Sequence, residues 1–181
     1  MIFIVELIAA AAVMGILSWL LLKSSPENIE TREKLCRNRI AGIAFALPTA
    51  LLCVPLAIPV TPGFLLLWLW PLAIVLPVLC FFHLDYYASR GWAFFLILFA
   101  YDTVHGVFEN HTPAAPLITV IALLAGIAGI WVSAKPCTLR DIFRKAARSE
   151  KWKYTASAAS ALIAVTAFYT LIMTIYGVFA R

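Results

Sequence analysis

Charged residues are scarce in this sequence, and the segments that lack them are the most informative. Only 13% of the 181 residues are charged, whereas 64% are hydrophobic. A soluble domain cannot bury that much apolar surface, so the composition predicts an all-α integral membrane protein with one membrane-embedded domain, residues 1–181. Each of six apolar runs is long enough to cross about 30 Å of hydrocarbon as a helix. The runs cover about residues 2–22, 40–60, 64–82, 91–108, 117–134 and 154–180.

Lysine and arginine are missing from every second gap between these runs. Thirteen of the fourteen fall in the gaps after runs one, three and five, and only Arg181 lies elsewhere. The thirteen are Lys23, Arg32, Lys34, Arg37, Arg39, Arg90, Lys135, Arg140, Arg144, Lys145, Arg148, Lys151 and Lys153. Short cytoplasmic loops carry this kind of excess. The pattern therefore predicts six spans in the cell (inner) membrane, with the N-terminus and the C-terminus both outside.

Several familiar signatures are also absent. The four cysteines include no CxxC and no Cys/His pair at zinc spacing, and none lies in an outer gap, so no disulfide framework is expected. The sequence has no nucleophile elbow, HExxH or P-loop. The first run lacks a preceding basic region, which predicts a retained helix and not a cleaved signal peptide. The net charge of +5 follows from topology, so we expect anionic lipid headgroups of the inner leaflet as partners, and no nucleic acid.

The second and third runs form a proline-rich hairpin. Thr61-Pro62-Gly63 joins them, and the prolines inside them are Pro48, Pro55, Pro59, Pro71 and Pro77. Interior prolines remove backbone hydrogen bonds and kink helices, and interrupted helices at membrane depth often line substrate sites. Two interpretations follow. The hairpin either spans fully, which gives a bundle of six transmembrane helices, or is re-entrant beside four full spans.

Two charged inner loops show helical patterns. Residues 24–39 carry the favourable i,i+4 pairs Glu30–Lys34 and Glu33–Arg37, which predict a short solvated helix. Residues 135–153 place an apolar face opposite a basic one and begin with a capping-box pattern, Thr138-x-x-Asp141. This second segment is predicted to be a basic amphipathic helix lying on the inner leaflet before the last span.

Small residues four apart mark helix faces that can approach closely in lipid. Ala122-x3-Gly126 and Ala125-x3-Gly129 lie in the fifth run, and the sixth begins with a stretch of alanine and serine, 156–161. Such faces pack either within the bundle or against another copy or a partner in a membrane complex. Tryptophans near the run ends, such as Trp92 and Trp131, fit an aromatic belt at the membrane interfaces.

Few ionisable residues lie inside the runs, and these are the candidate binding residues. Asp102, His105 and Glu109 share one face of the fourth run, at i, i+3 and i+7. Asp102 lies about 18 Å along the helix from Arg90, in the outer half of the membrane. Glu6 enters the first run from outside and is expected at a similar height to His105. Charged groups inside hydrocarbon are costly, and they are often functional.

These four residues allow two interpretations. In the functional one they line an outward-facing polar site that binds a cation or a polar solute, with Asp102 or His105 able to carry a proton. In the structural one, Asp102 and His105 pair within the helix, and Glu6 and Glu109 simply meet water. Asp102, His105, Glu109 and His111 could in principle bind a metal, but their spacing matches no specific motif and all four come from one helix and its exit loop. No metal ligand set and no catalytic residue is therefore assigned. His83 and His105 are too far apart in height to share a haem.

Three function classes remain open on this basis. The first is a small transporter or channel-like component, with the outward-facing polar site on the fourth span. The second is an accessory or assembly subunit of a membrane complex, suggested by the small-residue faces and the basic surface helix. The third is a membrane-embedded enzyme acting on a lipid or lipid-linked substrate, with Asp102 and His105 as acid and base. No cofactor is expected.

Overall fold

The computed structural model describes residues 2–109 and 112–179, and over these ranges it is helical, without a strand. Six helices are long and apolar enough to cross a membrane. They are α1 (Ile2–Leu22), α3 (Arg39–Ala57), α4 (Leu66–His83), α5 (Tyr87–Glu109), α6 (Ala115–Ala134) and α8 (Glu150–Phe179). Two shorter α-helices, α2 (Ile29–Arg37) and α7 (Cys137–Arg148), and three 3₁₀ turns, η1 (Pro26–Asn28), η2 (Ile58–Val60) and η3 (Gly63–Leu65), connect them.

The six predicted runs are confirmed as helices. α3 and α4 continue through Pro48, Pro55, Pro71 and Pro77, so the prolines do not interrupt them, and both are candidates for full spans. α5 and α8 begin four residues before their apolar runs, at Tyr87 and Glu150, because helical backbone bonding continues into the polar flanks. Asn38 starts α3, since its side chain accepts hydrogen bonds from the backbone amides of Ile40 (2.9 Å) and Ala41.

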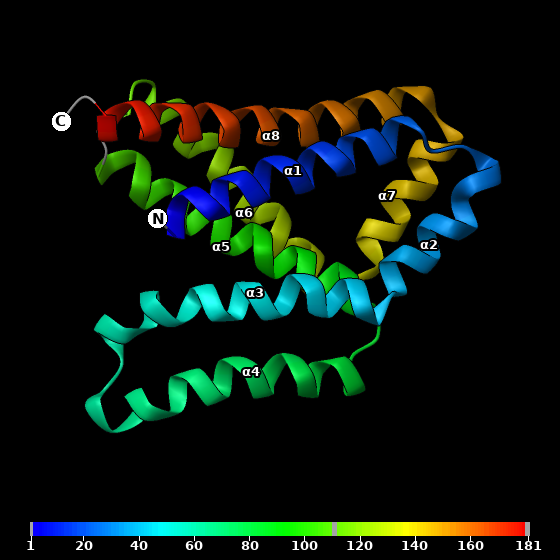
Figure 1. The fold of residues 1–181 in the computed structure, drawn as a ribbon. Helices are drawn as coiled ribbons and strands as arrows, with labels where there is room; N and C mark the ends of the chain where they lie inside the picture. The colour runs from blue at the N-terminus through cyan, green and yellow to red at the C-terminus, as the bar shows by residue number, and fades with distance from the viewer. Residues whose placement is uncertain (1, 110–111, 180–181) are drawn as a thin grey trace.

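α5 is the central helix of the bundle. In its apolar window 61% of residues are buried, against 6% for α4, which packs on α3 at the outside of the molecule. Figure 1 shows α1 and α8 side by side, α3 and α6 against α5, and α4 beyond α3. The main apolar core lies between α1, α5 and α8 and includes Leu7, Met14, Phe99 and Leu171.

Small residues let the helices approach closely, as the sequence predicts. A Cβ added at Gly129 of α6 would lie 2.8 Å from the carbonyl oxygen of Ala93 on α5, and one at Gly126 would lie 2.8 Å from the Cβ of Ala100. The Ala-x3-Gly faces of α6 therefore pack within the bundle. At the start of α8, the Ser157 hydroxyl lies 2.8 Å from that of Ser18 on α1.

The basic loops gather at one end of the bundle. α2, α7 and the turn between α4 and α5 meet there, while both termini lie toward the opposite end (Figure 1). We call these the basic end and the far end. α7 confirms the predicted amphipathic helix, because Leu139, Phe143 and Ala146 are buried against the bundle. The capping-box prediction was wrong: α7 begins at Cys137, with Pro136 in the capping position, and Thr138 does not cap it.

Candidate functional site: a buried carboxyl pair

The structure brings Glu6 and Asp102 together across α1 and α5. These helices run in opposite directions, with Glu6 in the second turn of α1 and Asp102 two turns before the end of α5. Their register is fixed on both sides of the acids. The ring of Phe3 occupies the space that a Cβ on Gly106 would need, and Leu7 packs in the core with Phe99. The glycine at position 106 therefore permits the close approach that places the two carboxyls side by side.

The Glu6 carboxyl group is almost fully enclosed. Glu6 is 1% exposed, and no hydrogen-bond donor within the described ranges reaches either of its carboxylate oxygens. Its neighbour is the carboxyl group of Asp102, which is half-buried and interacts with it directly. The thiol of Cys53 on α3 lies within electrostatic range of both acids. The two acids come from α1 and α5, and Cys53 of α3 lies near them, in the half of the bundle toward the far end.

Two adjacent carboxyl groups in this buried position cannot both carry a negative charge without a proton or a cation to balance it. An isolated buried charge is strongly unfavourable, and adjacent negative charges raise the cost further. A single proton changes the situation, because a protonated carboxyl donates a hydrogen bond to its neighbour. A bound cation would balance the charge in a similar way. The two carboxyl groups can therefore hold a proton or a small cation, because no hydrogen-bond donor of the described chain contacts the Glu6 carboxylate.

His105 and Glu109 lie apart from this pair. Both are exposed. The imidazole of His105 stacks on the Tyr101 ring, with ring centroids 4.2 Å apart, and its Nδ1 lies 3.0 Å from the Tyr101 carbonyl oxygen. Glu109 ends α5. Sequence position alone put Asp102, His105 and Glu109 on one face, but the contact between Asp102 and Glu6 depends on how α1 packs against α5.

Tyr86 ties the three basic loops together. Its backbone has φ 54°, in the left-handed region, which turns the chain sharply between α4 and α5. Its phenolic oxygen accepts hydrogen bonds from Nη2 of Arg37 (2.8 Å) and Nη1 of Arg140 (3.0 Å). No local sequence pattern predicts that both neighbouring loops bind this turn.

An ion pair joins α2 to α7 at the same end. Arg144 donates from Nε and Nη2 to the two carboxylate oxygens of Glu33, with Nη2 at 2.9 Å from Oε2. This pairing lowers the pKa of Glu33 and raises that of Arg144. The predicted Glu30–Lys34 pair is confirmed at 2.9 Å, whereas Glu33 binds Arg144 and not Arg37. The i,i+4 rule considers only residues four apart in one helix, so it could not predict that Glu33 pairs with Arg144.

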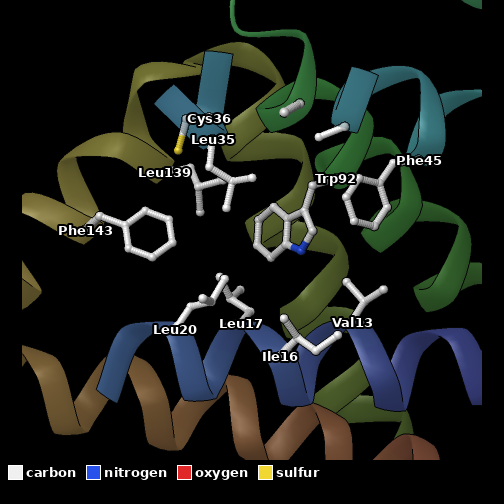
Figure 2. A pocket seen from close by; sticks show the side chains of 12 residues that line it. Val13, Ile16, Leu17, Leu20, Leu35, Cys36, Phe45, Trp92, Leu139 and Phe143 are labelled. Atoms are coloured by element: carbon white, nitrogen blue, oxygen red, sulfur yellow. The ribbon is translucent and has the colours of Figure 1, made fainter. Parts of the chain in front are cut away.

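An apolar cavity of about 220 Å³ lies between α1, α3, α5 and α7, toward the basic end. Figure 2 shows the Trp92 ring between Phe45 and the side chains of α1, such as Val13 and Ile16. The indole Nε1 is buried and has no hydrogen-bond partner in the described chain. Cys36 on α2 also lines the cavity, and burial raises the pKa of its thiol to about 11, which keeps the thiol protonated at neutral pH. Apart from these two atoms, the cavity offers little polar chemistry.

Within residues 2–109 and 112–179, no three or more His, Cys, Asp and Glu side chains cluster closely enough to hold a metal ion. The four cysteines are free thiols. No family model, curated protein or solved structure matches the chain. Among the features of the described chain, the buried carboxyl pair points most directly to a function.

Proposed function

We propose that this protein is a multi-pass integral membrane protein with six spans in the cell (inner) membrane. The basic end faces the cytoplasm and both termini lie outside. Two observations support this. Six helices have the required length and apolar character. Thirteen of the fourteen lysines and arginines lie in or beside α2, α7 and the turn between α4 and α5, which meet at one end (Figure 1). Trp19 fits the same placement, because it is 53% exposed near that end, with Lys23 over its ring at 4.5 Å.

Within this placement, we propose that the protein is a small transporter or channel-like component. Its binding site is the Glu6–Asp102 pair, which takes up a proton or a small cation from the outer side. The single observation that supports this proposal is a fully enclosed Glu6 carboxyl whose neighbour is a second carboxyl and not a donor. Ionisable groups inside membrane spans commonly serve ion pathways and proton relays.

His105 and Glu109 extend the proposed site toward the outer surface. Both are exposed on α5 between Asp102 and the far end of the helix. An imidazole has two ring nitrogens, one of which can accept a proton while the other donates one, so it can pass protons between water and a buried acid. We therefore propose a route in which Glu109 and His105 exchange protons or cations with the outside and the buried pair receives them.

Proteoliposomes provide the test. Purified protein is reconstituted into vesicles holding a pH-sensitive dye, and gradients of H⁺, Na⁺ and K⁺ are imposed in turn. The wild-type protein is expected to dissipate at least one gradient, and Glu6→Gln and Asp102→Asn are expected to reduce that flux to the level of empty vesicles. Glu150→Gln removes an exposed carboxylate at the basic end and serves as the matched control. Wild-type vesicles as tight as empty ones would contradict transport of these ions.

A second candidate function is an accessory subunit of a membrane complex. α4 supports it, because this helix packs on α3 and leaves most of its length uncovered, including Trp68 and Trp70. A peripheral helix of this kind can seat a helix of another chain or a second copy. Crosslinking in intact cells from a photoreactive residue at position 68 would test this, since an accessory subunit gives a protein adduct and an isolated transporter gives lipid adducts alone.

A further inference from the structure

A second cavity lies at the basic end, where α6 ends, α7 crosses and α8 begins. Its volume is about 480 Å³. Two tryptophans, Trp131 and Trp152, and two lysines, Lys135 and Lys145, contribute to its walls. Both tryptophans are largely exposed, at 64% and 55%. Tryptophan combines an apolar ring with one donor and favours the boundary between hydrocarbon and water.

An apolar groove continues from this cavity along α6. The groove has a volume of about 370 Å³ and is lined by Ile127, Ile130 and Ala134, together with Trp131 and Lys135. These last two residues also line the larger cavity, so the two spaces adjoin. The combined site therefore has a basic chamber at the end of the bundle and an apolar groove on the surface of α6 that runs from it.

The chamber has uncompensated positive charge. Lys145 lies with its Nζ 5.2 Å from the centre of the Trp152 ring. Asp141 also faces the chamber, but its Oδ1 already accepts hydrogen bonds from Nε (3.2 Å) and Nη2 (3.1 Å) of Arg140. The hydroxyl of Thr138 is buried at the chamber wall and has no partner within the described ranges. The two ammonium groups thus remain available to a ligand.

We propose that this site binds an anionic glycerophospholipid of the inner leaflet. Lys135 and Lys145 hold its phosphate, and an acyl chain lies in the groove along Ile127 and Ile130. Ammonium groups bind phosphate as point charges, and basic pockets between spans on the cytoplasmic side commonly hold anionic headgroups. This proposal rests on the membrane placement proposed above and not on the carboxyl pair.

The apolar groove is what selects a lipid over a soluble phosphate. A phosphate ion or a phosphorylated metabolite would use the two lysines but leave Ile127 and Ile130 uncovered. An acyl chain that lies along α6 covers Ile127 and Ile130, so that other lipids no longer contact these two side chains. The acyl chain must also extend from the chamber into the bilayer. The groove permits this, because it runs along α6, which is itself a candidate span.

Native mass spectrometry in a neutral detergent tests the proposal. The detergent removes the charged bilayer surface, so lysines outside the chamber contribute little to lipid binding. The full-length protein is titrated with phosphatidylglycerol and phosphatidylcholine, and we expect phosphatidylglycerol to bind at least about tenfold more tightly. The Lys135→Gln/Lys145→Gln double variant is expected to lose this preference. Ala159→Leu narrows the chamber without changing its charge and is expected to weaken the binding of both lipids.

The matched control removes two lysines of the same end that do not line the chamber, as Lys34→Gln/Lys151→Gln. It should bind phosphatidylglycerol as the wild type does, and a melting temperature for each variant establishes that the fold is retained. Equal affinity of the wild-type protein for the two lipids would overturn the proposal. The proposal would also be overturned if the control variant lost its preference for phosphatidylglycerol to the same extent, because the preference would then come from the overall positive charge of the surface. Competition by soluble glycerol phosphate as strong as that by phosphatidylglycerol would assign the chamber to a soluble ligand instead.

Discussion

Glu6 is the most deeply buried acidic residue in the described chain, and its environment explains why Asp102 matters. The sequence placed both residues among the apolar runs and predicted that Glu6 lies at a similar height to His105, but it did not predict a contact with Asp102. Their contact follows from Phe3, Gly106, Leu7 and Phe99, which set the register of α1 on α5. No local pattern in either run encodes that register, so the pair could be suspected from the sequence but not predicted.

Substitution of Asp102 separates its chemistry from its packing. Asp102→Asn keeps the size and the hydrogen-bonding capacity but removes the titratable proton, so we expect normal yield and melting temperature together with loss of ion flux. Asp102→Leu leaves the Glu6 carboxyl buried beside an apolar side chain, and this should cost about 1–3 kcal/mol of stability. Thermal denaturation in detergent measures the second effect. If the Leu variant were as stable as the Asn variant, the two carboxyls would not interact as described.

Glu33 makes the attachment of α7 sensitive to acid. Its folded-state pKa is lowered by Arg144, so the pair contributes stability above the unfolded pKa of about 4.3, and this contribution disappears as the pH falls through the folded value. We expect labels on α2 and α7 to move apart below about pH 4. The variant Glu33→Gln should show a distance that varies less with pH. An unchanged pH profile in that variant would locate the transition elsewhere.

At the scale of whole elements, the apolar runs and the amphipathic α7 were predictable because each depends on the periodicity of nearby residues. The Ala-x3-Gly faces also identified the surface of α6 that packs on α5. Contacts between distant loops were not predictable: Glu33 with Arg144, and Tyr86 with both Arg37 and Arg140, depend on how three loops meet at the basic end. The start of α7 was misplaced because Pro136 takes the capping position that Thr138 was expected to fill.

The α5–α6 interface should be sensitive to added volume at a single glycine. A side chain at Gly129 meets the backbone of Ala93, which cannot move without shifting α5. We expect Gly129→Leu to lower stability by about 1–3 kcal/mol or to reduce yield. Gly15 offers a control within another helix, because nothing in the described chain lies within 4 Å of a Cβ there, and Gly15→Leu should be silent. Equal behaviour of the two variants in thermal denaturation would contradict this interface.

For the whole molecule, the distribution of charge leads to a definite topology. Single cysteines introduced at Gly63 and Ala115, in a variant lacking the native cysteines, should react with a membrane-impermeant maleimide in intact cells. A cysteine at Ser149, between α7 and α8, should react only after the cells are opened. Labelling at position 149 in intact cells would reverse the proposed orientation, and it would move the carboxyl pair from the outer half to the inner half.

Reaction with a hydrophobic carbodiimide would show whether the Glu6–Asp102 pair holds an exchangeable proton or cation, as we propose. This reagent modifies protonated carboxyls in apolar surroundings and leaves ionised, water-exposed ones largely untouched. Mass spectrometry of the folded wild-type protein should locate an adduct at Glu6 or Asp102 and little at the exposed Glu150. An excess of a bound cation, or a rise in pH, should slow the reaction. A folded protein that reacts at Glu150 but at neither residue of the pair would contradict the account.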